Sequence, residues 1–207
     1  MTAGFWVLEG IDGCGKSTQA RLLHEVLDAE GRQPLHLREP GSTALGEGLR
    51  RMLLAPERQD WDARAEALVF FAARRELLVQ EVRPALAAGR DVVCERFTGS
   101  TYAYQGLGDP ETAAWVLELD RLVVGADQPQ GIFILDLDPE EADARVGREA
   151  PRDAFETRGL EFQRRVRQAY LDFAAARPER SRVLAVGGRG PEDIAVELQA
   201  AVEELRA

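Results

Sequence analysis

A glycine-rich stretch near the start of the chain combines the residue types and the spacing that phosphate binding requires. It reads Gly10-Ile-Asp-Gly-Cys-Gly-Lys-Ser-Thr18 and matches the pattern G-x-x-x-x-G-K-[ST]. In this pattern backbone N–H groups surround the α- and β-phosphates of a nucleotide, the lysine reaches the β- and γ-phosphates, and the serine hydroxyl ligates Mg²⁺. The predicted nucleotide-binding residues are Gly10, Ile11, Asp12, Gly13, Cys14, Gly15, Lys16, Ser17 and Thr18.

Lys16 is the single lysine of the chain, and the other twenty-five of its 26 basic residues are arginines. A compact ammonium and a planar guanidinium are not interchangeable where one side chain must reach closely packed phosphate oxygens. The phosphate loop is therefore the place where a lysine matters most, and Lys16 is predicted to be catalytic.

Short apolar runs alternate with amphipathic stretches along the whole chain. The expected strands cover residues 5–9, 34–38, 91–95, 131–137 and 182–186. The expected helices cover 16–29, 44–54, 62–88, 98–105, 110–123, 139–147, 159–177 and 191–206. This alternation predicts an α/β fold, in which a central five-stranded parallel sheet is flanked by helices and ligands bind at the carboxyl ends of the strands.

Length and composition predict one domain that spans residues 1–207, since the chain is 45% hydrophobic and shows no linker or repeat. The net charge of −10 argues against nucleic acid as a partner, because binding a duplex needs a positive face. We see no apolar run long enough to span a bilayer and no signal segment. We therefore expect a cytoplasmic protein that does not enter a membrane.

The phosphate loop alone does not distinguish a small-molecule kinase from a GTPase switch or a mechanical ATPase. GTPase switch proteins recognise guanine with an Asn-Lys-x-Asp motif. This chain has no lysine outside the phosphate loop, which argues against a GTPase. The strand at 91–95 ends in Glu95-Arg96. A carboxylate beside an arginine suits a kinase, in which Glu95 serves the Mg²⁺ site and Arg96 reaches an acceptor phosphate. The alternative is a structural ion pair at the end of the strand.

Two helices carry residues that suit recognition of a base. Phe70 and Arg74 lie four positions apart and share a helix face, where a ring can stack and a guanidinium can donate to a carbonyl oxygen. Thr101 and Gln105 have the same spacing and offer a hydroxyl and an amide beside Tyr104. The structural alternatives are a core aromatic beside a solvated arginine, and polar residues that cap or solvate a helix.

Several segments, taken in order, closely resemble the bacterial thymidylate kinase family. These are Glu9-Gly-Ile-Asp-Gly-Cys-Gly-Lys-Ser-Thr-Gln19, Arg38-Glu-Pro-Gly-Ser-Thr43, Phe70-Phe-Ala-Ala-Arg74, Glu95-Arg-Phe97 and Ala103-Tyr-Gln-Gly106. The resemblance implies a P-loop kinase fold with a short mobile lid. It also implies transfer of the γ-phosphoryl group of ATP to dTMP, with Mg²⁺ as cofactor, dTDP and ADP as products, and a homodimer formed through helices 62–88 and 110–123.

The resemblance assigns roles to named residues. Phe70 would stack on thymine, Arg74 would bind a thymine carbonyl, and Thr101 with Gln105 would contact the remaining base edge. Tyr104 would crowd the 2′ position of the sugar. The implied substrate-binding residues are Arg38, Glu39, Arg50, Phe70, Arg74, Arg96, Thr101, Tyr104 and Gln105. The implied catalytic residues are Lys16, Arg96, Arg148, Arg152 and Asp12, and the implied metal ligands are Ser17 and Glu95.

This sequence also departs from the family pattern. Glu95 stands where the family usually has Asp, which moves the carboxylate by about one methylene and leaves direct or water-mediated Mg²⁺ contact open. Ser42 replaces a usual Gly, which restricts the backbone at that turn. The usual Asp-Arg pair of the lid is also absent, because Arg152 precedes Asp153 and Ala154 follows it. The departures at Glu95 and in the lid keep open a third hypothesis, a nucleotide-binding regulator without activity, beside a dTMP kinase and a kinase of another nucleotide or nucleoside.

The catalytic cation must come from outside the loop, because Gly13 stands where the eukaryotic type of this kinase has an arginine. The charged, helix-breaking segment Gly147-Arg-Glu-Ala-Pro-Arg-Asp153 is the candidate lid, at about 147–154. Arg148 and Arg152 are favoured over Arg145 as the lid cations, and a solvated charged helix face is the alternative. Arg189, in the loop after the last strand, is the candidate to stack on adenine.

Overall fold

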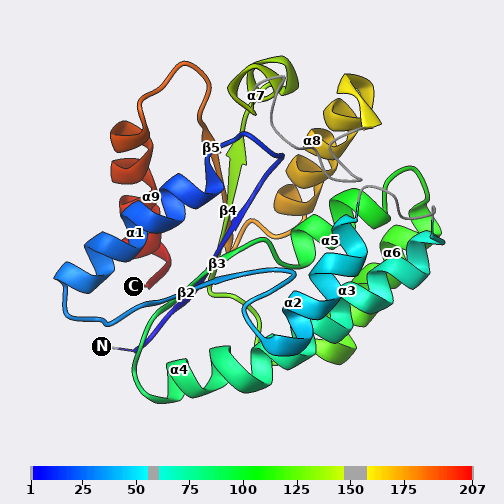
Figure 1. The fold of residues 1–207 in the computed structure, drawn as a ribbon. Helices are drawn as coiled ribbons and strands as arrows, with labels where there is room; N and C mark the ends of the chain where they lie inside the picture. The colour runs from blue at the N-terminus through cyan, green and yellow to red at the C-terminus, as the bar shows by residue number, and fades with distance from the viewer. Residues whose placement is uncertain (1, 56–60, 147–157, 207) are drawn as a thin grey trace.

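The structure has a sheet of five parallel strands in the order β2-β3-β1-β4-β5 (Figure 1). It is a computed structural model that describes residues 2–55, 61–146 and 158–206. The strands are β1 (Phe5–Glu9), β2 (Leu35–Arg38), β3 (Val92–Glu95), β4 (Gly131–Asp136) and β5 (Ser181–Ala185). Every expected strand is confirmed to within one residue at each end, and the α/β fold with its five-stranded parallel sheet is confirmed as well.

The helices cover both faces of this sheet. They are α1 (Lys16–Ala29), α2 (Ala44–Leu54), α3 (Ala63–Leu77), α4 (Arg83–Ala87), α5 (Thr98–Gln105), α6 (Pro110–Val123), α7 (Pro139–Val146), α8 (Leu160–Ala175) and α9 (Pro191–Arg206). The expected helix 62–88 is continuous but not regular, because a π-helical turn, η1 (Leu78–Val82), separates α3 from α4. Pro84 follows this turn and has no N–H to donate to the carbonyl four residues earlier, so regular α-helical bonding is interrupted there.

The side chains of the central strand alternate between two layers. Phe5 and Val7 pack into a cluster with residues of α3 and α6, whereas Trp6 and Leu8 pack into a second cluster with residues of α1 and α9. In Figure 1, α1 and α9 accordingly lie on one side of the sheet and α3, α5 and α6 on the other. A strand buried on both faces reads as an unbroken apolar run, which explains why the sequence revealed β1 clearly.

The order of the strands brings distant loops together at the carboxyl edge of the sheet. In the register of β1 and β3, Leu8 is opposite Glu95, and the Arg96 N–H donates to the Leu8 carbonyl at 2.8 Å. In the register of β2 and β3, Arg38 is opposite Glu95. The loops after these three strands therefore converge on one region. Such convergence is expected at the point in a parallel sheet where the order of the strands reverses.

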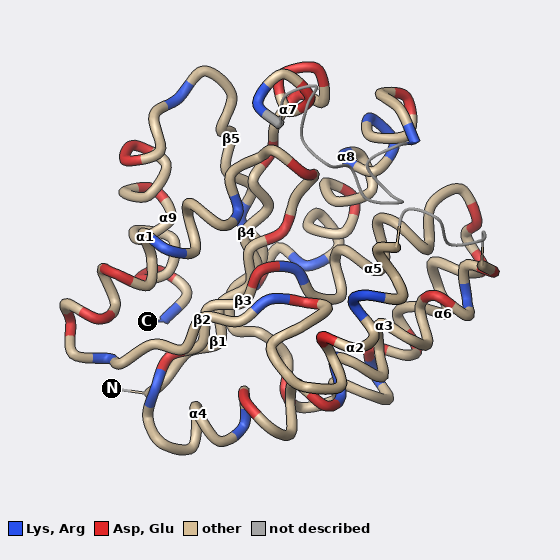
Figure 2. The backbone as a smooth tube through the Cα atoms, in the orientation of Figure 1, with Lys and Arg blue, Asp and Glu red and all other residues tan. Residues whose placement is uncertain are grey.

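Acidic and basic residues are adjacent in the sequence where β2 and β3 end, in the pairs Arg38-Glu39 and Glu95-Arg96. Figure 2 shows charges of both signs at this end of the sheet. Charges of both signs are also spread over the outer helices (Figure 2). Within the described ranges, none of the helices is long and apolar enough to cross a membrane.

Candidate active site

The phosphate loop has a backbone that glycine alone adopts without strain. Gly10 has φ +138°, and a Cβ there would lie 2.7 Å from the Leu135 carbonyl oxygen and 2.8 Å from the Cys14 sulfur. Gly15 has φ +96° and precedes α1. The first N–H groups of α1 have no acceptor within the helix, and they carry the positive end of its dipole. The loop and helix together form a site for anionic phosphates.

Lys16 lies across this loop and is largely buried. Its Nζ donates to the Gly10 carbonyl at 3.0 Å and to the Ile11 carbonyl at 2.8 Å. The same atom is 3.7 Å from an Asp12 carboxylate oxygen. The ammonium group is therefore bound to carbonyl and carboxylate oxygens of its own loop, and it must exchange these partners in order to bind a phosphate.

Ser17 and Glu95 meet beside the loop. The Ser17 hydroxyl donates to Glu95 Oε2 at 2.5 Å, and His36 Nε2 is 2.9 Å from Glu95 Oε1. Burial by itself raises the pKa of Glu95, but the hydrogen bonds from His36 and Ser17 outweigh it, so the pKa lies below its ordinary value. Glu95 is therefore ionised near neutral pH.

The donor chemistry of Ser17 and Glu95 fits Mg²⁺. A hydroxyl and a carboxylate are the hard oxygen ligands that this ion prefers, and Mg²⁺ at nucleotide sites uses one or two protein oxygens beside phosphates and water. In the part of the chain that the structure describes, no group of three or more His, Cys, Asp or Glu side chains forms a metal cage. The two residues thus suit a metal that arrives with phosphates.

Arg96 lies at the centre of the converging loops. It forms an ion pair with Asp12, and its Nη1 donates to Tyr170 Oη at 3.0 Å and to Ser100 Oγ at 3.1 Å. Its φ of +65° is a left-handed conformation that is unfavourable for a residue with a side chain. Burial alone raises the pKa of Asp12, but the charges of Arg96 and Lys16 outweigh it and bring that pKa to about 2.

Glu9 holds the turn that carries Arg96. Its Oε1 accepts from the backbone N–H of Phe97 at 2.9 Å and of Ser100 at 3.1 Å, and its Oε2 accepts from the Ser100 hydroxyl at 2.6 Å. The Glu9 side chain is fully buried, and this burial raises its pKa. Because three donors fix this carboxylate, it offsets the strain at Arg96 and orients the start of α5.

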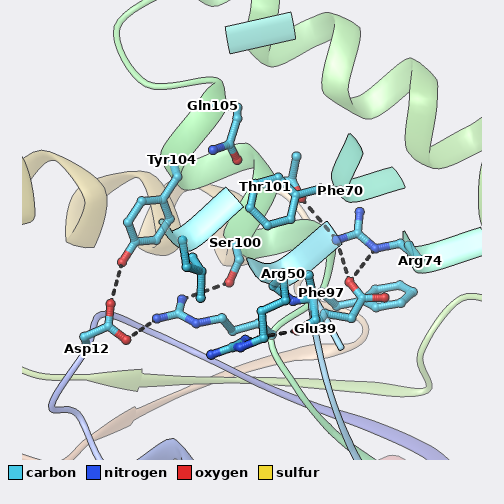
Figure 3. A pocket seen from close by; sticks show the side chains of 13 residues that line it. Asp12, Glu39, Arg50, Phe70, Arg74, Phe97, Ser100, Thr101, Tyr104 and Gln105 are labelled. Atoms are coloured by element: carbon cyan, nitrogen blue, oxygen red, sulfur yellow. Dashed lines mark hydrogen bonds and ion pairs between the residues drawn. The ribbon is translucent and has the colours of Figure 1, made fainter. Parts of the chain in front are cut away.

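A pocket of about 680 Å³ opens between α2, α3 and α5 (Figure 3). We call it the acceptor pocket. Its lining residues are Asp12, Glu39, Pro40, Arg50, Leu54, Phe70, Arg74, Arg96, Phe97, Ser100, Thr101, Tyr104 and Gln105. Of the nine substrate-binding residues implied by the resemblance, eight line this pocket, and the ninth, Arg38, lines the neighbouring one described below.

Arg74 is buried deep in the wall of the acceptor pocket. Its Nε and Nη2 contact Glu39 Oε2 at 2.8 and 2.7 Å, and Nη2 also donates to the Thr101 hydroxyl at 3.1 Å (Figure 3). Its guanidinium carbon lies 4.5 Å from the ring centre of Phe71 and 4.6 Å from that of Phe97. Arg74 is 1% exposed, so the alternative of a solvated surface arginine is wrong.

Among the residues that the structure describes, two polar atoms of this buried pair have no hydrogen-bond partner, namely Arg74 Nη1 and Glu39 Oε1. Buried polar atoms are normally paired, so an unpaired donor in the lining of a pocket indicates a ligand acceptor such as a carbonyl oxygen. Burial raises the pKa of Glu39 to about 7, and the charge of Arg74 offsets part of that rise.

The other residues predicted for the base are arranged around Arg74. Gln105 Nε2 donates to Glu66 Oε2 at 3.0 Å, which fixes the orientation of the amide. The Tyr104 hydroxyl donates to Asp12 Oδ2 at 3.4 Å (Figure 3). Phe70 and Thr101 complete this part of the lining.

A second pocket, of about 980 Å³, lies over the phosphate loop, and we call it the phosphate-loop pocket. Its lining residues are Asp12, Gly13, Gly15, Lys16, Ser17, Thr18, Arg38, Glu39, Arg50, Glu95, Arg96 and Arg145. The two pockets share Asp12, Glu39, Arg50 and Arg96. Ligands in the two pockets would therefore meet at two carboxylates and two arginines.

The remaining arginines predicted for phosphate contacts are held by neighbours. Arg38 Nη2 lies 3.1 Å from Glu47, and Arg50 Nη1 donates to the Pro40 carbonyl at 3.0 Å. Arg145 Nη2 contacts Glu141 at 2.7 Å and a backbone carbonyl of the loop after β5 at 3.2 Å. The predicted lid, with Arg148 and Arg152, lies outside the described residues.

Arg189 lies apart from both pockets. Its Nη1 contacts Glu197 at 2.5 Å and the Ala185 carbonyl at 2.9 Å, and its Nη2 donates to the Asp193 carbonyl at 3.2 Å. Stacking of Arg189 on adenine stays a prediction, and it requires the guanidinium to leave the ion pair with Glu197.

Ser42 occupies the turn position at which the family usually has a glycine. Ser42 has φ +62°, in the left-handed region that favours glycine. Its hydroxyl accepts from the Arg38 N–H at 2.9 Å, and its own N–H donates to Glu47 at 3.1 Å. These local bonds offset the strain and connect the turn to Arg38, which lines the phosphate-loop pocket.

The sequence analysis missed several residues that organise the site. These are Glu9, His36, Glu66, Ser100 and Tyr170. Glu9 had a usable signal, because a carboxylate at the end of an apolar strand needs buried partners. The others depend on contacts between distant segments, which the local sequence does not reveal.

Comparison with known proteins identifies the family of this chain. The sequence model of the family described as thymidylate kinase matches residues 8–192. The thymidylate kinase of Ruegeria pomeroyi is 41% identical over 198 residues, which cover 95% of this chain and 93% of that protein. The corresponding protein of Symbiobacterium thermophilum is 39% identical over 202 residues, covering 97% and 93%.

A solved structure is similar over the same extent. The crystal structure of thymidylate kinase from Ehrlichia chaffeensis superimposes with a TM-score of 0.79 at 31% sequence identity, and the match covers 98% of this chain and 100% of that one. Sequence and fold thus agree, and the chain belongs to the thymidylate kinase family.

Proposed function

We propose that this chain transfers the γ-phosphoryl group of ATP to dTMP, giving dTDP and ADP. The observation that carries the proposal is the meeting of the two pockets at Asp12 and Arg96, in a member of the thymidylate kinase family. One pocket has a phosphate loop and the other has a buried donor, Arg74 Nη1, beside a platform for a base. A nucleotide in each would bring two phosphate groups toward each other.

On the ATP side, the loop N–H groups and Lys16 bind the phosphates. Ser17 and Glu95 would hold Mg²⁺, which would supply positive charge to neutralise the phosphate oxygens. Lys16 exchanges the carbonyl oxygens of Gly10 and Ile11 for phosphate oxygens as the nucleotide enters. Arg189 is proposed to contact the adenine.

On the dTMP side, Arg74 Nη1 donates to a carbonyl oxygen of thymine. The Thr101 hydroxyl accepts from Arg74 and so can donate its own proton to the base, while Gln105 contacts the remaining edge. Phe70 stacks on the ring, and Tyr104 lies beside the sugar. This donor pattern favours a base with a carbonyl oxygen at the position where cytosine has an amino group.

The reaction requires positioning and charge neutralisation rather than a general base, because the attacking acceptor phosphate is already anionic. Arg38, Arg50 and Arg96 bind that phosphate, and Asp12 keeps Arg96 oriented through their ion pair. Arg148 and Arg152 of the lid are proposed to reach the transferring group.

We further propose one kinase domain over 1–207 and a cytoplasmic homodimer that acts on nucleotides rather than nucleic acid. The dimer would form through α3, η1, α4 and α6. Exposed apolar side chains on these elements support it, since Leu68, Val79 and Leu122 are 51%, 44% and 67% exposed.

The test is release of ADP in a coupled assay with Mg-ATP and each of dTMP, dUMP, dCMP, AMP and thymidine. The expected result is the highest kcat/KM with dTMP. A higher kcat/KM with another acceptor would establish a different kinase. Nucleotide binding without turnover of any acceptor would establish a regulator instead.

A further inference from the structure

Glu95 is fixed at both oxygens by residues of different elements. Ser17 at the start of α1 donates to Oε2 at 2.5 Å, and His36 on β2 lies 2.9 Å from Oε1. A carboxylate that has lost its proton can only accept hydrogen bonds. His36 Nε2 is therefore the donor in this contact.

Two donors are required to orient this particular side chain. A glutamate at a strand end can rotate about three side-chain bonds, and a single hydrogen bond to one oxygen leaves the plane of the carboxylate free. With Ser17 on one oxygen and His36 on the other, the direction in which the carboxylate faces the phosphate loop is set. The Glu95 side chain is also 15% exposed, which restricts it further.

His36 itself is not placed to ligate a metal. Its Nε2 is committed to Glu95, and its ring lies beside that of His24 on α1, with 6.5 Å between ring centres. Groups that hydrogen-bond to metal-binding carboxylates commonly contribute 10- to 100-fold to metal affinity, because they fix ligand orientation. His36 has this relation to Glu95.

We propose that His36 is a positioning residue for the Mg²⁺ site, which holds the Glu95 carboxylate so that it serves the metal together with Ser17. The proposal rests on the proposed use of Mg-ATP. In this role His36 acts through Glu95, by orienting the carboxylate that serves the metal.

The experiment measures Mn²⁺ affinity by electron paramagnetic resonance of free Mn²⁺, with a non-hydrolysable ATP analogue bound; Mn²⁺ accepts the same oxygen ligands as Mg²⁺. His36→Phe keeps a ring but removes the donor, and it should weaken Mn²⁺ binding about tenfold. His36→Gln keeps an N–H donor and should restore much of the affinity. His24→Phe, the same change at the other histidine, should leave it unaltered.

A second background separates orientation from general damage. In Glu95→Asp the shorter side chain cannot contact Ser17 and His36 together, so adding His36→Phe should change Mn²⁺ affinity less than about twofold. Equal losses from His36→Phe in both backgrounds, or equal affinities of His36→Phe and His24→Phe in the native background, would overturn the proposal. Affinity for the ATP analogue without metal, and the melting temperature, should stay unchanged in His36→Phe.

This outcome is independent of the acceptor. If the native protein binds the Mn²⁺–analogue complex but does not phosphorylate dTMP, the proposed function fails while the Mn²⁺ measurements still decide the role of His36. If dTMP is phosphorylated and His36→Phe binds Mn²⁺ normally, the proposed function stands and the role of His36 fails.

Discussion

The acceptor pocket and the phosphate-loop pocket share Asp12 and Arg96, but they are built in different ways. The acceptor pocket is lined by side chains from α2, α3, α5 and the segments beside them, and its central arginine, Arg74, is fixed by Glu39 and Thr101. The phosphate-loop pocket relies on backbone N–H groups of one short segment and on cations at its edges.

The cations of the two pockets also differ in what they must do when a ligand arrives. Within the described residues Arg74 Nη1 has no partner, and we expect Arg74 to keep its contacts with Glu39 and Thr101 when a ligand binds. Lys16 and Arg145 are bound to carbonyl and carboxylate oxygens of the protein, so they must exchange partners. The acceptor pocket is thus preorganised for its ligand, whereas the phosphate-loop pocket rearranges around its own.

The largest expected effect is on the phosphate-loop side. Lys16→Met removes the ammonium of the single lysine, which lines the phosphate-loop pocket, and we expect kcat to fall about 10²- to 10³-fold. Affinity for dTMP should remain within about twofold, because Lys16 does not line the acceptor pocket. Coupled ADP release and dTMP titration measure the two quantities.

Lys16→Arg is the matched control, since it keeps the charge in a planar group. It should recover little activity. Full activity of either variant would contradict the assignment of Lys16 to the transferring phosphates.

On the acceptor side, Arg74→Met should lower both dTMP affinity and stability. It leaves the Glu39 carboxylate buried without its cation, which costs about 3–5 kcal/mol of unfolding free energy in comparable buried pairs. Urea unfolding measures the loss. The double variant Arg74→Met/Glu39→Met removes both charges and should be much less destabilised, and equal destabilisation of the single and double variants would show that the pair does not act as a unit.

The pH dependence of Glu39 tests the burial of the acceptor pocket. Its pKa is raised from 4.5 to about 7, so the folded state favours the protonated form. The contribution of protonated Glu39 to the free energy of unfolding is fully present below pH 4.5. It is lost as pH rises through about 7, and the total loss is at most about 3 kcal/mol. Urea unfolding from pH 5 to pH 8 should show that the free energy of unfolding falls more in the native protein than in Glu39→Gln. Parallel pH profiles of the two proteins would contradict the raised pKa of Glu39.

Asp12, where the pockets meet, should respond to pH in the opposite direction and more weakly. Its pKa is lowered from 3.8 to about 2, so it stabilises the folded state above pH 3.8 and loses this effect as pH falls through about 2. The full effect is about 2 kcal/mol. Between pH 5 and pH 3, native stability should decline faster than that of Asp12→Asn, and a difference that stays constant would count against the ion pair with Arg96.

The two pockets also differ in how far the sequence predicts them. The phosphate loop is one contiguous segment with a fixed pattern, so its position between β1 and α1 and the extent of α1 were predicted correctly. The five strands were predictable for a similar reason, because strands buried on both faces are short apolar runs. The π-helical turn before Pro84 was not, since the apolar spacing there is compatible with a regular helix.

The acceptor pocket required the resemblance to a family, because each of its residues alone has a commonplace structural reading. The ion pair of Arg96 and Asp12 joins positions 84 apart, and the contact of Gln105 with Glu66 joins positions 39 apart. Such pairs depend on strand order and helix packing. Local propensity and spacing carry no information about them.

The central claim is that the acceptor pocket is preorganised, and calorimetric titration of dTMP tests it most directly. The titration is made with the protein alone and again with Mg²⁺ and a non-hydrolysable ATP analogue. The account predicts saturable binding in both, with Kd values that differ by less than about threefold. Absence of dTMP binding without the analogue, or tightening by more than about tenfold with it, would show that the acceptor pocket forms only when the ATP side is filled.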